Sequence, residues 1–489
     1  MPAIILATFN ARYQHPALGL RYLQANLGAA RADADVLEFD LQTAPLDAAE
    51  QILARQPRIV GLGAYIWNVR LVADVLAILR RVRPDLVLVL GGPEISYETE
   101  SHPLAETADY VLCGEADLAL GGLCRELLAG GRPAERIIRV LPPDLARLEL
   151  PYELYTDQDL QHRLVYVEAA RGCPLGCEYC LSSIEPGVRR FPLETILPAF
   201  ERLLARGARR FKFVDRTFNL DLDFGRALLE FWYARQRPGL EVHFEIVPQL
   251  LTDDWLALLG RAPPGLLRLE VGVQTFDAAV AARVGRRQEP ERVADALRGL
   301  RTQTMARIHA DLIAGLPGER LPGFAAGFDR LVRLQPHEIQ VGLLKRLRGT
   351  ALGRHDAEWG MVYNPQPPYE LLQNNLLDFA ALQRLRRLAR FWESLYNSGH
   401  FLETLPRLWA DAEASPFAEF DRLSAWLWAR LGRCHAIPLV VLTEGLFRYL
   451  TEVKGLDKKE LAGVLLRDYT RGARREIPGF LRPDRCARG

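Results

Sequence analysis

The stretch Arg171-Gly172-Cys173-Pro174-Leu175-Gly176-Cys177-Glu178-Tyr179-Cys180 places three cysteines four and then three residues apart. It directly follows Val165–Ala169, an apolar run that is typical of a buried strand. Thiolates in such a short loop can bind an iron–sulfur cluster or zinc. A structural zinc site needs a fourth Cys or His, and the nearest histidine is His162. The sequence therefore favours a [4Fe-4S] cluster held by three cysteines, with one iron left open.

The cysteine loop lies near the start of a series of strand-length apolar runs separated by helix-length segments. Within residues 161–364 this alternation predicts a partial (β/α)6 barrel of the TIM type, with catalytic groups at the carboxyl ends of its strands. The expected strands are Val165–Ala169, Phe211–Val214, Glu241–Val247, Leu267–Val273, Ile308–Ala314 and Glu338–Leu344.

An earlier series of the same kind occupies residues 1–140 and predicts a doubly wound, Rossmann-like parallel sheet. The expected strands are Ile4–Thr8, Val36–Phe39, Ile59–Gly63, Leu86–Leu90 and Tyr110–Leu112. Sheets of this type bind ligands beyond the carboxyl ends of their strands. The candidate ligand-binding residues there are Gly63, Tyr65, Gly91, Gly92, Gly114 and Glu115, although each glycine alone could mark a tight turn.

The remaining segments differ from these two series. Residues 141–160 are rich in proline and mixed charge, which indicates a linker. Residues 365–489 lose the strand pattern and predict a helical C-terminal domain. The expected helices are Leu371–Tyr396, Phe417–Leu431 and Val440–Lys454.

The overall composition is that of a globular protein with several domains. The 489 residues are 49% hydrophobic and 25% charged, with a formal net charge of +1, so nucleic acid is not an expected partner. Neither a basic signal-peptide region nor a run of ~20 apolar residues is present, and we expect a cytoplasmic protein without a membrane span. The other cysteines have no ligand spacing: Cys113, Cys124, Cys434 and Cys486.

With an aromatic residue before its last cysteine, the Cys-x3-Cys-x2-Cys loop resembles the hallmark of the radical S-adenosylmethionine (SAM) superfamily. Val214–Asn219, Glu270–Thr275 and His309–Glu319 are similar to later barrel motifs of that family. The resemblance implies that SAM chelates the open iron and is cleaved reductively to a 5′-deoxyadenosyl radical. It also implies cofactor contacts, although each acidic strand end could equally be structural; the candidates are Tyr179, Asp215, Glu245, Gln274 and Asp311.

The doubly wound domain ahead of the barrel resembles the cobalamin-binding subgroup of that superfamily. The matching stretches are Pro16–Leu23, Val60–Tyr65, Leu90–Glu94 and Asp109–Glu115. The Asp-x-His-x-x-Gly motif of many cobalamin enzymes is absent, because His15 lacks the flanking Asp and Gly. The resemblance thus implies a cobalamin whose lower face has no histidine, unless the domain has lost its cofactor. By position alone, the residues that could cover that face are Tyr65, Ile66, Trp67, Asn68 and Arg70.

The subgroup implies methylation of an unactivated carbon or phosphorus as the leading hypothesis for function. Radical rearrangement or cyclisation without methyl transfer is the alternative, and a cofactor-binding sensor is a third. A methylthiotransferase would carry three further cluster cysteines in its first domain, where this chain has only Cys113 and Cys124. The expected partners are a small-molecule or peptide substrate and a low-potential electron donor such as flavodoxin or ferredoxin.

Overall fold

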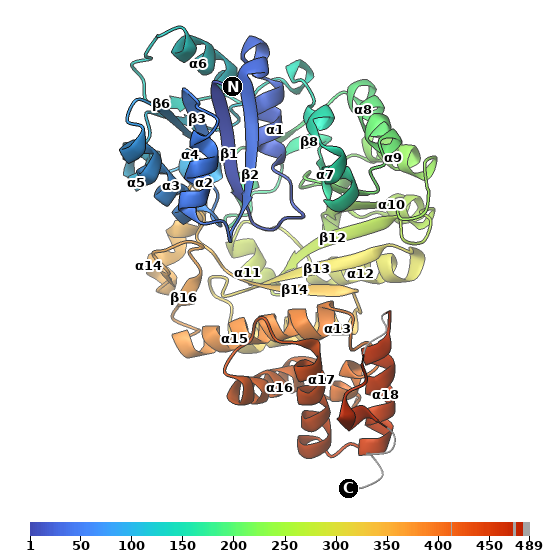
Figure 1. Ribbon diagram of the computed structural model, residues 1–489. Coiled ribbons are helices and arrows are strands. Elements are labelled where there is room, and N and C mark those ends of the chain that lie inside the picture. Colours follow the sequence, from blue (N-terminus) through green and yellow to red (C-terminus); the bar gives the residue numbers. More distant parts are fainter. Residues whose placement is uncertain (412, 473–475, 483–489) are drawn as a thin grey trace.

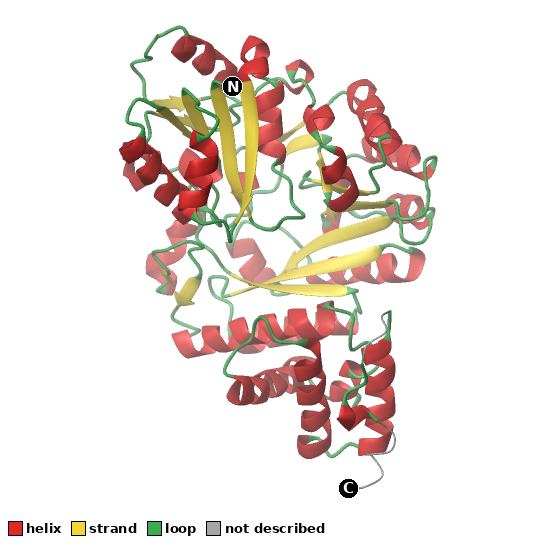
Figure 2. Cartoon of the chain, viewed as in Figure 1, coloured by secondary structure: helices red, strands yellow, loops and turns green. Residues whose placement is uncertain are grey.

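The computed structural model describes residues 1–411, 413–472 and 476–482, so Cys486 lies outside the described residues. Figure 1 shows a first α/β unit at one end, a second sheet in the middle and a group of helices at the C-terminal end. Figure 2 shows that helices flank both sheets. Within the described part of the chain, no helix is long and apolar enough to cross a membrane.

The first sheet is parallel, with strand order β2-β1-β3-β4-β5-β6. Because β2 and β3 lie on opposite sides of β1, a crevice forms at the carboxyl ends of β1 and β3. This confirms the doubly wound prediction, to which the structure adds the short strand β6. The strands are β1 (Ile4–Asn10), β2 (Ala34–Asp40), β3 (Ile59–Gly63), β4 (Val87–Gly91), β5 (Tyr110–Cys113) and β6 (Ile137–Arg139). The helices are α1 (Leu18–Ala25), α2 (Pro45–Leu53), α3 (Val69–Val82), α4 (Pro93–Ser96), α5 (Pro103–Thr107) and α6 (Ala119–Leu128).

The second sheet is a partial barrel of six parallel strands, in the order β14-β13-β12-β11-β10-β7, which confirms the predicted architecture. In β12 and β13 buried residues alternate with less buried ones, most of which are polar. The strands are β7 (Val165–Val167), β10 (Arg210–Phe213), β11 (Glu241–Ile246), β12 (Leu267–Gln274), β13 (Arg307–Ala314) and β14 (Glu338–Leu343). The helices are α8 (Leu193–Ala205), α9 (Leu222–Tyr233), α10 (Asp253–Gly260), α11 (Ala278–Arg283), α12 (Pro290–Gln303) and α13 (Leu321–Arg333).

The cysteine loop is enclosed by a small antiparallel hairpin that the sequence pattern did not predict. Its strands are β8 (Ala170–Cys173) and β9 (Gly187–Arg190). Gly172 has φ +93°, and a Cβ there would overlap the Gly187 carbonyl oxygen, so this position requires glycine. Cys173 is therefore the last residue of a strand whose partner lies beyond the loop.

The segment interpreted as a linker packs closely against the barrel. It contains the helix α7 (Asp157–His162) and two short 3₁₀ turns. Leu145, Leu148, Tyr152 and Tyr155 are buried in the same apolar cluster as the barrel strands. The prolines of residues 141–160 therefore belong to a segment that turns along the surface of the barrel.

The C-terminal part is helical, as predicted, but its first helix begins later than the sequence indicated. Leu371–Gln373 forms β16, which pairs with β15 (Val362–Tyr363), and a predicted helix from Leu371 is wrong at that point. The helix starts after Asp378, whose carboxylate accepts a hydrogen bond from the Ala381 amide at 2.8 Å. The helices are α14 (Asp356–Trp359), α15 (Phe379–Trp392), α16 (Pro416–Leu431), α17 (Leu439–Arg448) and α18 (Lys458–Thr470).

Candidate functional site

The three loop cysteines line one cavity of about 190 Å³ at the carboxyl ends of the barrel strands. Four of the five cofactor-binding candidates in the barrel line it with them: Tyr179, Glu245, Gln274 and Asp311. The structure thus brings together residues from the loop, β11, β12 and β13. We call this space the cysteine cavity.

The fifth candidate, Asp215, is not among the residues that line this cavity. Its buried carboxylate accepts a hydrogen bond from the Ala169 amide at 3.0 Å, just before β8. Burial raises the pKa of Asp215 to about 8. Asp215 therefore supports the strand that leads into the loop, and a direct cofactor contact by Asp215 stays a prediction.

The loop is held in place by close backbone contacts with the segment after α11. The Glu178 amide donates to the Val284 carbonyl at 3.0 Å. Gly285 has φ +71°, and a Cβ there would overlap the Gly176 carbonyl oxygen. These contacts fix the backbone of the loop that carries the three thiols.

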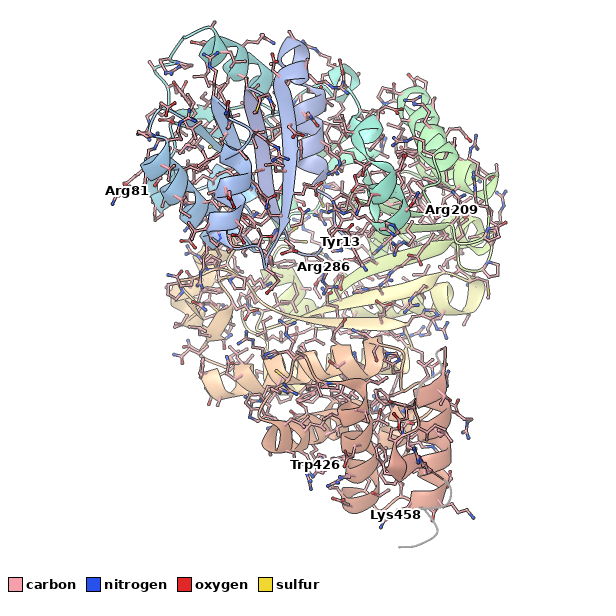
Figure 3. All side chains as sticks on the ribbon, in the orientation of Figure 1. Tyr13, Arg81, Arg209, Arg286, Trp426 and Lys458 are labelled. Atoms are coloured by element: carbon pink, nitrogen blue, oxygen red, sulfur yellow. The ribbon has the colours of Figure 1, made fainter. Side chains whose placement is uncertain are left out.

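Arg286 is a functional candidate that the sequence reasoning missed. Its guanidinium donates to Cys177 Sγ at 3.6 Å, to Gln288 Oε1 at 2.7 Å and to the Gly272 carbonyl. Figure 3 shows Arg286 in the middle of the molecule, between the first sheet and the barrel strands. A buried cation beside a thiol favours the thiolate form, and an arginine fork also matches a carboxylate.

The donor set, three thiols from one short loop, has the ligand chemistry of an iron–sulfur cluster. Across the ranges that the structure describes, no group of three His, Cys, Asp or Glu side chains gathers around one metal position. A cubane takes one thiolate on each of three irons, so its ligands must surround a space rather than meet at a point. Cys173, Cys177 and Cys180 all line the cysteine cavity.

The barrel interior beside this cavity carries paired charges. Lys212 lies 3.0 Å and His243 3.1 Å from Glu270, and together they outweigh burial and hold the pKa of Glu270 well below its usual range. His309 lies 3.1 Å from the carboxylate of Asp311 and 3.2 Å from that of Glu338. Burial acts to lower the pKa of His309, but these carboxylates raise it to about 10.

A larger cavity of about 660 Å³ lies between the first sheet and the barrel, at the crevice of β1 and β3. All six candidates of the first domain line it: Gly63, Tyr65, Gly91, Gly92, Gly114 and Glu115. Gly92 has φ +104°, and a Cβ there would lie 2.5 Å from the Ala64 carbonyl oxygen. Gly92 is therefore required for close backbone packing against Ala64, while Gly63, Gly91 and Gly114 present no side chain to the cavity. We call this space the interdomain cavity.

Aromatic side chains form one wall of the interdomain cavity. Tyr65 and Trp67 stack with ring centroids 4.5 Å apart, and Trp67 donates to the Phe9 carbonyl at 3.0 Å. His15 also lines the cavity and lies 5.6 Å from the ring of Tyr166, between ring centroids. Burial lowers the pKa of His15. Both sets of side chains thus line the cavity in which the family resemblance implies a cobalamin.

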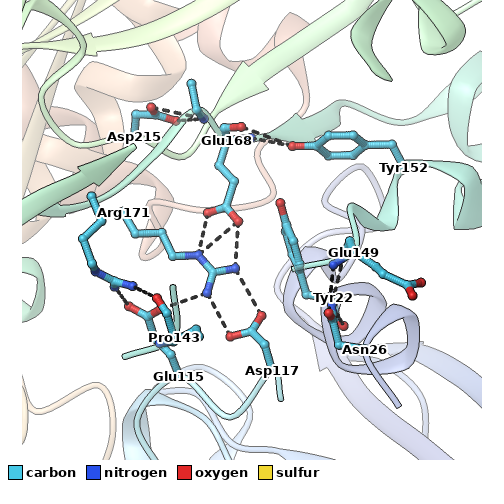
Figure 4. Close-up of polar contacts among 12 residues, drawn as sticks. Tyr22, Asn26, Glu115, Asp117, Pro143, Glu149, Tyr152, Glu168, Arg171 and Asp215 are labelled. Carbon is cyan, nitrogen blue, oxygen red and sulfur yellow. Dashed lines mark hydrogen bonds and ion pairs between the residues drawn. The ribbon is translucent and has the colours of Figure 1, made fainter. Parts of the chain in front are cut away.

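An ion-pair network joins the two domains beside this cavity, as Figure 4 shows. Arg171, two residues before the first loop cysteine, contacts Glu115 at 2.9 Å, Asp117 at 2.8 Å and Glu168 at 2.8 Å. Arg189 of β9 also binds Glu115. The Glu115 carboxylate is therefore engaged by two guanidinium groups, and its predicted contact with a cofactor has to coexist with them.

The family models divide the chain in the same way as the structure. Residues 167–322 match the model of the radical SAM superfamily, and residues 4–123 match a B12 binding domain. The chain is a radical SAM protein with a B12-binding domain. A [4Fe-4S] cluster, SAM and cobalamin are accordingly the cofactors of its family. Residues 357–487 match a family described only as a protein of unknown function.

Curated relatives of this radical SAM protein are distant in sequence. It is 25% identical over 230 residues to 2-(S-pantetheinyl)-carbapenam-3-carboxylate methyltransferase of Streptantibioticus cattleyicolor, covering 40% of this chain and 33% of that protein. It is 24% identical over 332 residues to the uncharacterized methyltransferase PH0819 of Pyrococcus horikoshii, covering 62% and 70%. The chain thus spans only a third of the length of the carbapenam enzyme.

Solved structures with a similar fold include those of TsrM and OxsB. The methyltransferase TsrM of Kitasatospora setae, with tryptophan and a SAM analogue bound, is 18% identical with a TM-score of 0.59, covering 77% of this chain and 80% of TsrM. The cobalamin-dependent radical enzyme OxsB, with aqua-cobalamin and SAM bound, is 14% identical with a TM-score of 0.65, covering 96% and 84%. At these identities the likeness concerns the radical SAM fold.

Proposed function

We propose that this chain is a cobalamin-dependent radical SAM methyltransferase that acts on an unactivated carbon or phosphorus. The observation that carries the proposal is that the cysteine cavity and the interdomain cavity are both lined by Arg216. A methyl group carried in one cavity would then lie next to the radical chemistry of the other. When bound, the cluster supplies the electron that cleaves SAM, and cobalamin supplies a transferable methyl group.

The side chains divide the binding work between the two cavities. In the cysteine cavity the three cysteines would hold the cluster, Arg286 would pair with the SAM carboxylate, and Gln274 would contact the nucleoside. Glu245 is held by Arg216 at 2.8 Å, so that its carboxylate is fixed at the cavity wall. In the interdomain cavity the glycine-lined strand ends would cradle the corrin ring, and the Tyr65–Trp67 stack would cover one of its faces.

The domain division follows from the same argument. Residues 1–140 would bind cobalamin, residues 141–160 would connect them to the barrel, residues 161–364 would bind the cluster and SAM, and residues 365–489 would form a helical C-terminal domain. A flavodoxin or ferredoxin would supply the electrons. Three thiolates that must stay reduced suit the reducing cytoplasm, where we place the enzyme.

Radical rearrangement or cyclisation without methyl transfer is the second candidate. It is favoured by the likeness to OxsB, which is described as a radical enzyme and not as a methyltransferase. Its requirement for cofactors would be the same. The two candidates differ in the fate of SAM, since methyl donation yields S-adenosylhomocysteine and radical cleavage yields 5′-deoxyadenosine.

The test is anaerobic purification with iron, sulfide and cobalt counted per chain, followed by incubation with methyl-deuterated SAM and dithionite. We expect about four irons, one cobalt, and both 5′-deoxyadenosine and S-adenosylhomocysteine. Formation of 5′-deoxyadenosine alone would favour rearrangement, and formation of neither product would contradict an enzymatic role. Four irons without cobalt would refute the assignment of the first domain.

A further inference from the structure

A third cavity, of about 420 Å³, lies between the edge strand β14 and the helix α15, and we call it the lateral cavity. All three parts of the chain line it. Arg12 comes from the loop after β1, Tyr179 from the cysteine loop, and Arg390 from α15. Tyr179 also lines the cysteine cavity, so a molecule in the lateral cavity reaches the border of the SAM site.

The wall that α15 and the turn after it contribute is fixed to the barrel by directional contacts. Asn397 accepts a hydrogen bond from the Ile339 amide at 2.9 Å and donates to the Ile339 carbonyl at 2.9 Å. Tyr396 donates to the Pro336 carbonyl at 3.0 Å. The Asn397 amide thus pairs with the open edge of β14 as a neighbouring strand would. The lateral cavity is therefore a built feature of the fold.

Positive charge predominates in the lateral cavity. Its cationic side chains are Arg12, Lys345, Arg386 and Arg390, against the carboxylates of Glu370 and Glu393.

Both carboxylates already have partners. Glu370 lies 3.7 Å from Arg386, and Glu393 accepts a hydrogen bond from Asn397 at 2.7 Å. Among the residues that the structure describes, the side chains of Arg12, Lys345 and Arg390 have no ion-pair partner. Unpaired cations in a concave site focus a positive potential that attracts anions.

We propose that the lateral cavity binds the substrate through an anionic group, a phosphate or a carboxylate, held by Lys345, Arg390 and Arg12. This deepens the proposed function and rests on it. Apolar side chains of Ile313 and Leu343 line the same cavity, so the substrate combines an anionic end with an apolar body. Its apolar body extends past Tyr179 to the cysteine cavity. The C-terminal domain thereby determines substrate specificity.

The test measures anion binding by calorimetry on the holoenzyme loaded with cobalamin and SAM, so that the other two cavities are filled. Inorganic phosphate and succinate are the probes. Arg390→Gln and Lys345→Gln should each weaken binding by about tenfold or more, the effect of losing one charge-assisted hydrogen bond. Arg390→Lys keeps the charge and should retain most of the affinity. The tighter of the two probes identifies the anionic group.

Arg81→Gln and Lys458→Gln are the matched controls, because both residues lie on the outside of the molecule (Figure 3) and neither lines the lateral cavity. They should bind both anions as the wild type does. Equal affinity in Arg390→Gln and the wild type, or no binding of either anion to the wild type, would overturn the proposal. Failure of the proposed function is distinguishable, because the loaded holoenzyme would then form no SAM products while its anion binding stayed intact.

Discussion

Replacement of Arg171 by glutamine should destabilise the protein strongly, because this one guanidinium compensates three carboxylates at the domain boundary. The side chain of Arg171 is 13% exposed, and those of Glu168 and Asp117 are 6% and 8% exposed. Removing one partner of a buried ion pair costs about 3–5 kcal/mol, since the remaining charges stay buried without compensation. We expect a loss of about that size in the free energy of unfolding.

The effect of Arg171→Gln should also depend on pH. Burial raises the pKa of Glu168 even with Arg171 in place, so its folded pKa exceeds its unfolded value. Such a group contributes stability at low pH that is lost as the pH rises through the folded pKa. Without the guanidinium this pKa rises further. The destabilisation should therefore be larger at alkaline than at acidic pH.

The assay is denaturant unfolding of the variant beside Arg202→Gln, which breaks an ion pair whose side chains are 57% and 55% exposed. An exposed pair contributes only about 0–1 kcal/mol, so this control should barely shift the midpoint. The double variant with Asp117→Asn should show coupling, since both changes affect one network. An Arg171→Gln midpoint that matches the Arg202→Gln midpoint would refute the reasoning.

Three further predictions concern the cofactors and the buried acids. Cys177→Ala should abolish SAM cleavage and lower the iron count, and a variant that still forms 5′-deoxyadenosine would contradict the cluster assignment. Gly92→Ala adds a Cβ 2.5 Å from the Ala64 carbonyl oxygen at φ +104°, so cobalt per chain should fall while iron per chain is unchanged. Burial raises the pKa of Glu319 from 4.5 to about 8, so the denaturation midpoint of the wild type should fall as the pH rises between these values. In Glu319→Gln the midpoint should fall less steeply with pH, and a slope identical to that of the wild type would disprove this role of Glu319.

The fold was predictable where apolar runs are long and follow one another at regular spacing. The strands β1, β3, β12 and β13 are of this kind, and their neighbours in the sheets follow from chain order. The short strands β6, β8, β9, β15 and β16 have two to four residues each, and they exist because tertiary contacts supply their partners. No window of sequence carries that information.

The same distinction separates the predicted site residues from those that were missed. The cysteines are local in sequence, and Gln274 and Asp311 follow from their places near the carboxyl ends of strands. Arg286 stands after α11 without any motif, and only the folded loop brings it to Cys177. Arg171 is next to the loop in sequence, but two of its three carboxylate partners, Glu115 and Asp117, come from the first domain.

The three cavities also limit how a reaction can proceed. The cysteine cavity, at about 190 Å³, is smaller than the interdomain cavity of about 660 Å³ and the lateral cavity of about 420 Å³. It adjoins the interdomain cavity at Arg216 and the lateral cavity at Tyr179. A substrate in the lateral cavity and a methyl carrier in the interdomain cavity would thus approach the same central space from different sides. Because the first sheet, the barrel and α15 all line these spaces, the relative placement of the three domains determines whether the reacting atoms can meet.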